Sequence, residues 1–321
     1  MSASPLAPYR SVEQRRQAVR DAAAPAGAKL VVYGESVDGE PLEAVAVSSH
    51  ATDAPRVLCS ANIHGPEWVG FEVALALLHA LHDPVGPAAA LRGQAEVWVA
   101  PCLNPDGYRR TWERQGVGPL VSLRTNANGV DLNRNYPLPH GARRRSVPGA
   151  GSNTPGDPTY AGTHALSEPE TAALDALCRQ QRFHASANLH SFMGTVIPAS
   201  VRDRPCFSRY KTLCRAFGDA QPRKRYRRLS SRVFDVFTGE QEDHQHHVHD
   251  SWAACVEVFP VGASYRQHLR APCTFWRFNP HDPAPWVAND LPGVIAFLTA
   301  ALELPRPSEL QPQLSPAAAS T

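Results

Sequence analysis

The chain has 321 residues and a mass of 34.9 kDa, enough for one large α/β domain or two small ones. Hydrophobic residues make up 43% and charged residues 19%, as in a globular protein with a sizeable core. A net charge of +2 and a pI near 8.2 give no electrostatic case for a nucleic-acid or membrane-surface partner. The local basic cluster at 223–228 is interpreted as a solvated segment.

Cysteine usage and the N-terminal sequence predict the compartment. The seven cysteines include no close-spaced pair, which favours a reducing compartment over a disulfide framework. The first ten residues contain no apolar core of a secretory signal. The sequence also contains no stretch of 18 apolar residues that would span a membrane. We therefore expect a cytoplasmic protein.

The first hundred residues predict the opening of a mixed α/β sheet. The expected elements are a polar helix over 12–24, strands over 29–33, 42–48 and 56–63, a helix over 68–82 and a strand over 95–101. Asp38-Gly39 is a strong hairpin-turn signal between the first two strands.

The remaining two thirds begin with a long segment, 102–165, that has little periodicity, and such a segment is usually functional or disordered. The elements expected after it are a helix over 167–182, a strand over 183–189, a helix over 206–217, a strand over 253–259 and a helix over 291–302. With no repeat or linker, we predict a lead-in over 1–28, one domain over 29–304 and a disordered tail over 305–321.

A candidate metal site lies where the strand over 56–63 meets the next helix. His64 ends the strand and Glu67 opens the helix, and ligands of α/β sheets bind at the carboxyl ends of strands. Imidazole nitrogen and carboxylate oxygen both suit zinc. His190, which follows a later strand, is a candidate third ligand; the alternative is a hydrogen-bonded core histidine. Two nearby ligands and one distant ligand, with water as the fourth, are typical of catalytic zinc.

Further motifs connect these residues to a known family. The runs Asn104-Pro-Asp-Gly107 and Gly129-Val-Asp-Leu-Asn-Arg-Asn-Tyr-Pro137, together with Arg124, stand between His64-x-x-Glu67 and His190. In this order the motifs resemble the zinc metallocarboxypeptidases of the carboxypeptidase A superfamily (M14-type, funnelin), in the style of its compact bacterial members. The resemblance implies a phosphorylase/hydrolase-like α/β fold, with a mixed, mostly parallel twisted sheet of about eight strands and helices on both faces.

The resemblance also implies the metal centre. His64, Glu67 and His190 would hold one Zn²⁺ per chain. Asp131 would contact the far nitrogen of His64 and fix its tautomer and basicity.

Substrate-binding and catalytic roles follow from the same resemblance. Asn133 and Arg134 would grip the free terminal carboxylate of the substrate, and Arg124 would stabilise the oxyanion of the scissile carbonyl. Glu257 would be the general base. The local sequence supports a functional role for Glu257, because a carboxylate inside Ala-Ala-Cys-Val-Glu-Val-Phe is costly to desolvate unless it has a partner.

The sequence departs from the family in two places. The region that usually supplies a substrate-capping tyrosine, 233–247, contains none, and neither Tyr226 nor Tyr265 aligns cleanly with it. The second departure is the acidic and histidine-rich segment 240–250, which would contribute to the pocket for the terminal side chain.

That segment supports two further expectations. Glu242 and Asp243 would favour a cationic side chain: Lys, Arg or the amino group of diaminopimelate. A second metal could bind among His244, His246, His247 and His249, but a solvated loop is the favoured interpretation.

The leading hypothesis is a zinc-dependent hydrolase that releases a C-terminal residue from a peptide or amino-acid conjugate with a free carboxylate. Cleavage of the γ-D-glutamyl–diaminopimelate bond of murein peptides is one specific form of it. The alternatives are an N-acyl amino acid deacylase of the aspartoacylase or succinylglutamate desuccinylase type, and an inactive ligand-binding relative. The sequence leaves the oligomeric state open.

Overall fold

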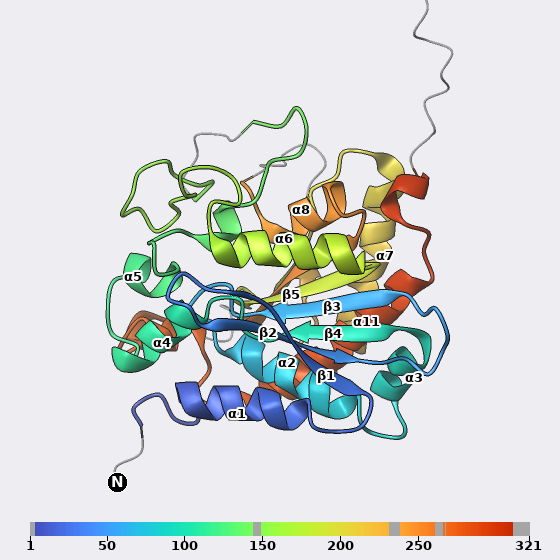
Figure 1. The fold of residues 1–321 in the computed structure, drawn as a ribbon, viewed down its shortest axis with the longest axis horizontal. Helices are drawn as coiled ribbons and strands as arrows, with labels where there is room; N and C mark the ends of the chain where they lie inside the picture. The colour runs from blue at the N-terminus through green and yellow to red at the C-terminus, as the bar shows by residue number, and fades with distance from the viewer. Residues whose placement is uncertain (1–3, 144–148, 231–237, 261–265, 267, 311–321) are drawn as a thin grey trace, which may run out of the picture.

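The computed structural model describes residues 4–143, 149–230, 238–260, 266 and 268–310, which fold around one eight-stranded sheet (Figure 1). The strand order is β1-β2-β4-β3-β5-β8-β6-β7. The strands are β1 (Ala28–Glu35), β2 (Pro41–Val47), β3 (Arg56–Ala61), β4 (Glu96–Ala100), β5 (Ala185–Phe192), β6 (Thr195–Pro198), β7 (Arg227–Arg228) and β8 (Trp252–Pro260). Four of the seven pairings are parallel, which confirms the predicted mixed sheet.

Helices cover both faces of the sheet (Figure 1). They are α1 (Val12–Ala22), α2 (Val69–Ala80), α3 (Pro87–Gln94), α4 (Pro105–Glu113), α5 (Leu120–Arg124), η1 (Leu132–Arg134), α6 (Pro169–Gln181), α7 (Arg204–Ala220), α8 (Gln241–His247), α10 (Phe275–Phe278), α11 (Ala284–Leu302) and η2 (Pro307–Leu310). The larger core cluster includes residues of α1, α2, α7 and α11, whereas α6 packs in the smaller one.

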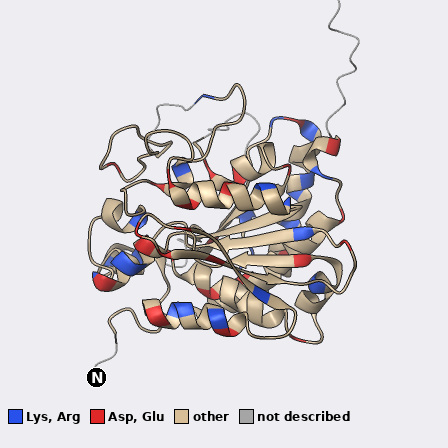
Figure 2. Ribbon diagram, viewed as in Figure 1, with Lys and Arg blue, Asp and Glu red and all other residues tan. Residues whose placement is uncertain are grey.

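The central strands are apolar on both sides because both sides are covered. In β3, Val57 and Cys59 enter the larger core and Leu58 enters the smaller one. A parallel strand covered on both faces has a continuous run of apolar residues, and this is why the strand can be predicted from the sequence. Figure 2 shows basic and acidic positions together on α1 and spread over the other elements.

Several boundaries differ from the prediction. Segment 102–165, expected to be irregular, contains α4, α5 and η1. Helix α11 begins seven residues before the predicted start and contains Pro292, whose ring ordinarily disrupts a helix interior. By length and composition α11 could cross a membrane, but Phe297 and Leu298 are buried in the main core, as in a core helix. The predicted disordered tail is wrong at its start, since 307–310 form η2; residues 311–321 lie outside the described part.

Strand order brings distant residues together at one edge of the sheet. Strand β5 lies between β3 and β8 and is parallel to both, so their carboxyl ends meet. The turn after β3 carries His64, and His190 pairs in register with Glu257 on β8. His190 and Glu257 are 67 residues apart in sequence, and both lie near the turn that carries His64, more than 120 residues earlier in the chain.

The end of β8 is held by a buried hydrogen-bond relay. Phe259 has a positive φ of 66°, which is costly for a bulky residue. Its backbone N–H donates to the Tyr226 hydroxyl (3.0 Å), which in turn donates to Asp290 (2.9 Å). This relay fixes the backbone two residues beyond Glu257.

Candidate metal centre and active site

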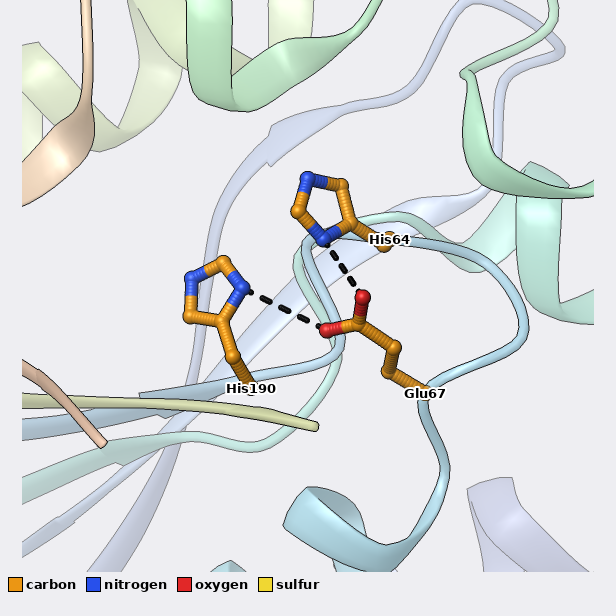
Figure 3. Close-up of side chains that lie close together, drawn as sticks. All are labelled: His64, Glu67 and His190. Atoms are coloured by element: carbon orange, nitrogen blue, oxygen red, sulfur yellow. Dashed lines mark hydrogen bonds and ion pairs between the residues drawn. The ribbon is translucent and has the colours of Figure 1, made fainter. Parts of the chain in front are cut away.

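The structure brings the three predicted metal ligands together (Figure 3). His64 Nδ1 lies 2.8 Å from Glu67 Oε1, and His190 Nδ1 lies 3.3 Å from Glu67 Oε2. All three side chains are at most 3% exposed, and their ligand atoms lie within 4.8 Å of one another. Two imidazoles and a carboxylate that converge in a buried site form a donor set that fits zinc.

The turn between β3 and α2 is tightly built. Asn62 has a positive φ of 56° and its side-chain amide donates to the carbonyl of His64 (2.9 Å). A Cβ on Gly65 would lie 2.2 Å from the carbonyl oxygen of Leu123, so this position needs glycine. The Trp68 and Val69 amides both donate to Asn279 Oδ1, which satisfies the start of α2. These contacts set the direction of the His64 and Glu67 side chains.

A second layer supports the ligands. Asp131 Oδ1 lies 3.2 Å from His64 Nε2, and Arg124 Nε donates to Asp131 Oδ2 at 2.9 Å. Burial opposes ionisation of Asp131, but Arg124 and His64 outweigh it and hold the pKa of that carboxyl well below its usual range. Burial likewise opposes ionisation of Glu67, whose pKa the two histidines hold low. The structure therefore places Asp131 where a metal-ligand histidine needs an anionic partner.

A cavity of about 250 Å³ opens beside the three ligands. Its lining also includes Arg124, Asn133, Arg134, Ser191, Phe192, Met193, Ile197, Glu240, Glu242, Cys255, Glu257 and Phe278. Of the predicted catalytic and substrate-binding residues, only Asp243 is missing from this lining. Sequence reasoning missed the apolar residues Met193 and Phe278, since nothing in their local sequence marks them; Glu240 lies in the acidic segment predicted to contribute to the pocket, but it was not singled out.

Glu257 faces the cavity from β8. Its Oε2 is buried and has no hydrogen-bond partner among the described residues. Burial, together with the negative charge of Glu67, raises the pKa of Glu257 to about 7. A carboxyl group with a pKa near neutrality can both accept and return a proton, as a general base must.

Asn133 and Arg134 lie on η1, on another wall of the cavity. Arg134 Nη1 is 3.3 Å from Glu240 Oε1, while its Nε donates to the carbonyl of Gly149 (2.9 Å). Asn133 Oδ1 accepts from the backbone N–H of Gln241 (2.9 Å), which leaves its amide nitrogen for another partner. The guanidinium is thus held in place at the cavity.

The segment 240–250 is not the solvated loop that we predicted, because 241–247 form a helix, α8, in which residues 241–246 are buried. Its polar side chains are buried against partners that are distant in sequence. Gln241 donates to Ser60 and Asn188, and His246 contacts the Tyr210 hydroxyl.

The two acids of α8 differ in position. Glu242 lines the cavity, and its Oε2 has no hydrogen-bond partner among the described residues. Burial and the neighbouring Glu240 and Asp243 raise the pKa of Glu242 well above its usual value. Asp243 instead accepts from the backbone N–H of Ser200 (2.7 Å), so it carries no part of the proposed pocket.

Of the two tyrosines that flank the region expected to carry a capping tyrosine, Tyr226 is not placed to cap a substrate. Tyr226 lies in the core relay behind β8 and does not line the cavity. Residues 231–237 and Tyr265 lie outside the described part of the chain.

Comparison with known proteins gives consistent matches. The family model described as zinc carboxypeptidase matches residues 18–257. The catalytic chain of carboxypeptidase N from Rattus norvegicus is 29% identical over 247 residues, covering 73% of this chain and 51% of that protein. This chain thus spans about half the length of that relative.

Two further matches bear on fold and activity. Bovine thrombin-activatable fibrinolysis inhibitor, solved with a tick carboxypeptidase inhibitor, superposes with a TM-score of 0.74 at 19% identity, covering 92% of this chain and 98% of that one. It shares the fold. An inactive metallocarboxypeptidase of Ajellomyces dermatitidis is 25% identical over 183 residues, covering 54% of this chain and 31% of that protein.

Proposed function

The chain belongs to the zinc carboxypeptidase family, a family of metal-dependent peptide-bond hydrolases, and on that premise we propose that it releases a C-terminal residue from its substrate. One observation carries the proposal. The predicted ligand triad, the carboxyl group of Glu257 and the guanidinium groups of Arg124 and Arg134 all face one cavity. The motif resemblance predicted this family, and the family match confirms it.

His64, Glu67 and His190 would hold the zinc ion. When bound there, zinc supplies a Lewis acid that polarises the scissile carbonyl and makes water more acidic. Asp131 keeps His64 in the orientation that presents Nδ1.

The other cavity residues bind the substrate, stabilise negative charge and transfer a proton. Arg134, with the amide of Asn133, binds the terminal carboxylate and places the last peptide bond near the ligand triad. Arg124 donates to the oxygen of the scissile carbonyl as negative charge develops on it. Glu257 removes a proton from the attacking water and returns it to the leaving amine, so the peptide bond breaks with no net proton transfer from the protein.

We assign the substrate class from Glu242. Its Oε2, which has no hydrogen-bond partner in the described part of the chain, lies in the cavity of about 250 Å³ beside the ligand triad. A buried carboxylate without a partner is unfavourable, and a cationic side chain of the substrate would relieve this cost. The proposed substrates therefore end in Lys, Arg or diaminopimelate. The seven unpaired cysteines are consistent with a reducing compartment, where we propose that the protein acts.

Glu242→Gln tests this specificity. On peptides ending in Lys or Arg we expect kcat/KM to fall about 30-fold, because the amide cannot pair with a buried cation. On a peptide ending in Phe the variant should match or exceed the wild type. Steady-state hydrolysis of these peptides and of L-Ala-γ-D-Glu-diaminopimelate measures both effects.

Asp243→Asn is the matched control, since Asp243 is buried in the same helix turn but lies outside the cavity. A similar loss on basic and aromatic peptides in Glu242→Gln would contradict the specificity assignment. N-acetyl-aspartate is included to distinguish a carboxypeptidase from an N-acyl amino acid deacylase. Hydrolysis of that compound alone indicates a deacylase. If none of the compounds is hydrolysed, the protein is an inactive relative.

A further inference from the structure

A second cluster of metal-ligating side chains lies outside the active-site cavity, between α6 and α8. Asp175 Oδ1 is 2.7 Å from His244 Nε2 and 2.8 Å from His249 Nε2. The three side chains are at most 7% exposed. They come from α6, from α8 and from the turn after α8, so the fold rather than local sequence assembles them.

The cluster has the same donor chemistry as the active-site triad. In both places two imidazole nitrogens approach one carboxylate, and the three ligand atoms lie within 4.8 Å of one another. Two histidines and a carboxylate suit Zn²⁺ better than Mg²⁺ or Ca²⁺, which prefer oxygen ligands.

The protonation states also suit a metal. Burial lowers the pKa of both His244 and His249, so their imidazoles are neutral at neutral pH and have a lone pair to donate. Burial opposes ionisation of Asp175, but the two histidines outweigh it and lower the pKa of its carboxyl. Metal ligands must be in these forms.

An approach from solvent exists. A surface hollow beside the cluster is lined by Cys178, Arg179, Arg182, Val248, His249 and Asp250. Arg179 bonds the other oxygen of Asp175, but its side chain is 72% exposed and can turn toward solvent. The hollow can admit a cation and supply water as a further ligand.

The other two histidines of the segment do not take part. His246 Nδ1 is engaged by the Tyr210 hydroxyl (2.9 Å), and His247 Nε2 lies 2.8 Å from the carbonyl of Ser200. This makes His247 a useful control, since it lies between His244 and His249 in sequence but contacts Ser200 instead of Asp175.

We propose that Asp175, His244 and His249 bind a second Zn²⁺, separate from the catalytic site. The ion would connect α6 to α8 and the turn that follows. Because Glu242 lies two residues before His244 on α8, the same ion would hold the helix that forms one wall of the active-site cavity.

Zinc stoichiometry of the full chain tests the proposal. After incubation with Zn²⁺ and removal of loosely held ion, elemental analysis should give two zinc ions per wild-type chain. The variant His64→Ala/His190→Ala, in which the proposed cluster is untouched, should retain one. Adding His249→Ala to it should reduce the content to zero, whereas adding His247→Ala should leave one.

A second measurement separates metal binding from a purely structural role. Asp175→Asn keeps an acceptor oxygen for the histidines but removes the charge, so it should fold and lose the second ion. Zn²⁺ should raise the melting temperature of His64→Ala/His190→Ala but not of the same chain with Asp175→Asn. The proposal is overturned if His64→Ala/His190→Ala binds no zinc, or if His249→Ala and Asp175→Asn leave its zinc content unchanged.

Discussion

Glu257→Gln should lower kcat by about 10³-fold while the zinc content stays at the wild-type level. Glutamine has nearly the same shape as glutamate, so the cavity and the β8 register with His190 should be kept. Its amide cannot accept a proton from water at neutral pH or return one to the leaving amine. The loss should therefore appear in kcat with little change in KM, as for a group that acts in the transition state.

Steady-state kinetics on a C-terminal Lys peptide and elemental analysis of the same preparation measure this prediction. Equal zinc content in the two proteins shows that the loss does not come from an empty metal site. If Glu257→Gln keeps more than about a tenth of the wild-type kcat, Glu257 is not the general base, since such a group contributes at least about 10²-fold.

Arg134→Ala should lower kcat/KM by about 100-fold on substrates with a free terminal carboxylate, mostly through KM. The guanidinium lines the cavity and is held by Gly149 and Glu240, so its loss removes a preorganised charged hydrogen-bond donor. Hydrogen bonds to charged groups contribute about 1.5–3 kcal/mol each, and a paired contact to a carboxylate reaches this effect.

A matched pair of peptides isolates the contact. The wild type should strongly prefer the free carboxylate over the same peptide with a terminal amide, and Arg134→Ala should lose most of that preference. Arg56→Ala, at a partly exposed arginine on β3 outside the cavity, serves as the control. An unchanged preference in Arg134→Ala would show that another group binds the terminal carboxylate.

The structure brings the three candidate metal ligands close together, and the sequence predicts this proximity from features that can be recognised locally. His64 and Glu67 share one turn, and the apolar run before them reads clearly as a strand. His190 could be added because it also ends a strand, and parallel neighbours bring their ends together. The structure places it within β5, one residue past the predicted end, with the same consequence.

The parts that sequence reasoning missed depend on contacts between distant segments. The run 240–250 is polar and looks solvated, yet Gln241 and His244 find partners on β3, β5 and α6 that no local pattern reveals. For the same reason Glu242 and Asp243 could not be separated, although one lines the cavity and the other binds the backbone of Ser200. Asp175 lies in an ordinary amphipathic helix pattern, and only the fold places it against two histidines.

The most direct test of the function is release of a single residue from a peptide ending in Lys, compared with the same peptide carrying a terminal amide. The zinc-loaded protein should release free lysine from the first peptide only. A chelator should abolish the release, and added Zn²⁺ should restore it. Release that is insensitive to the chelator, cleavage inside the peptide or equal hydrolysis of the amidated peptide would contradict a zinc carboxypeptidase that binds the terminal carboxylate.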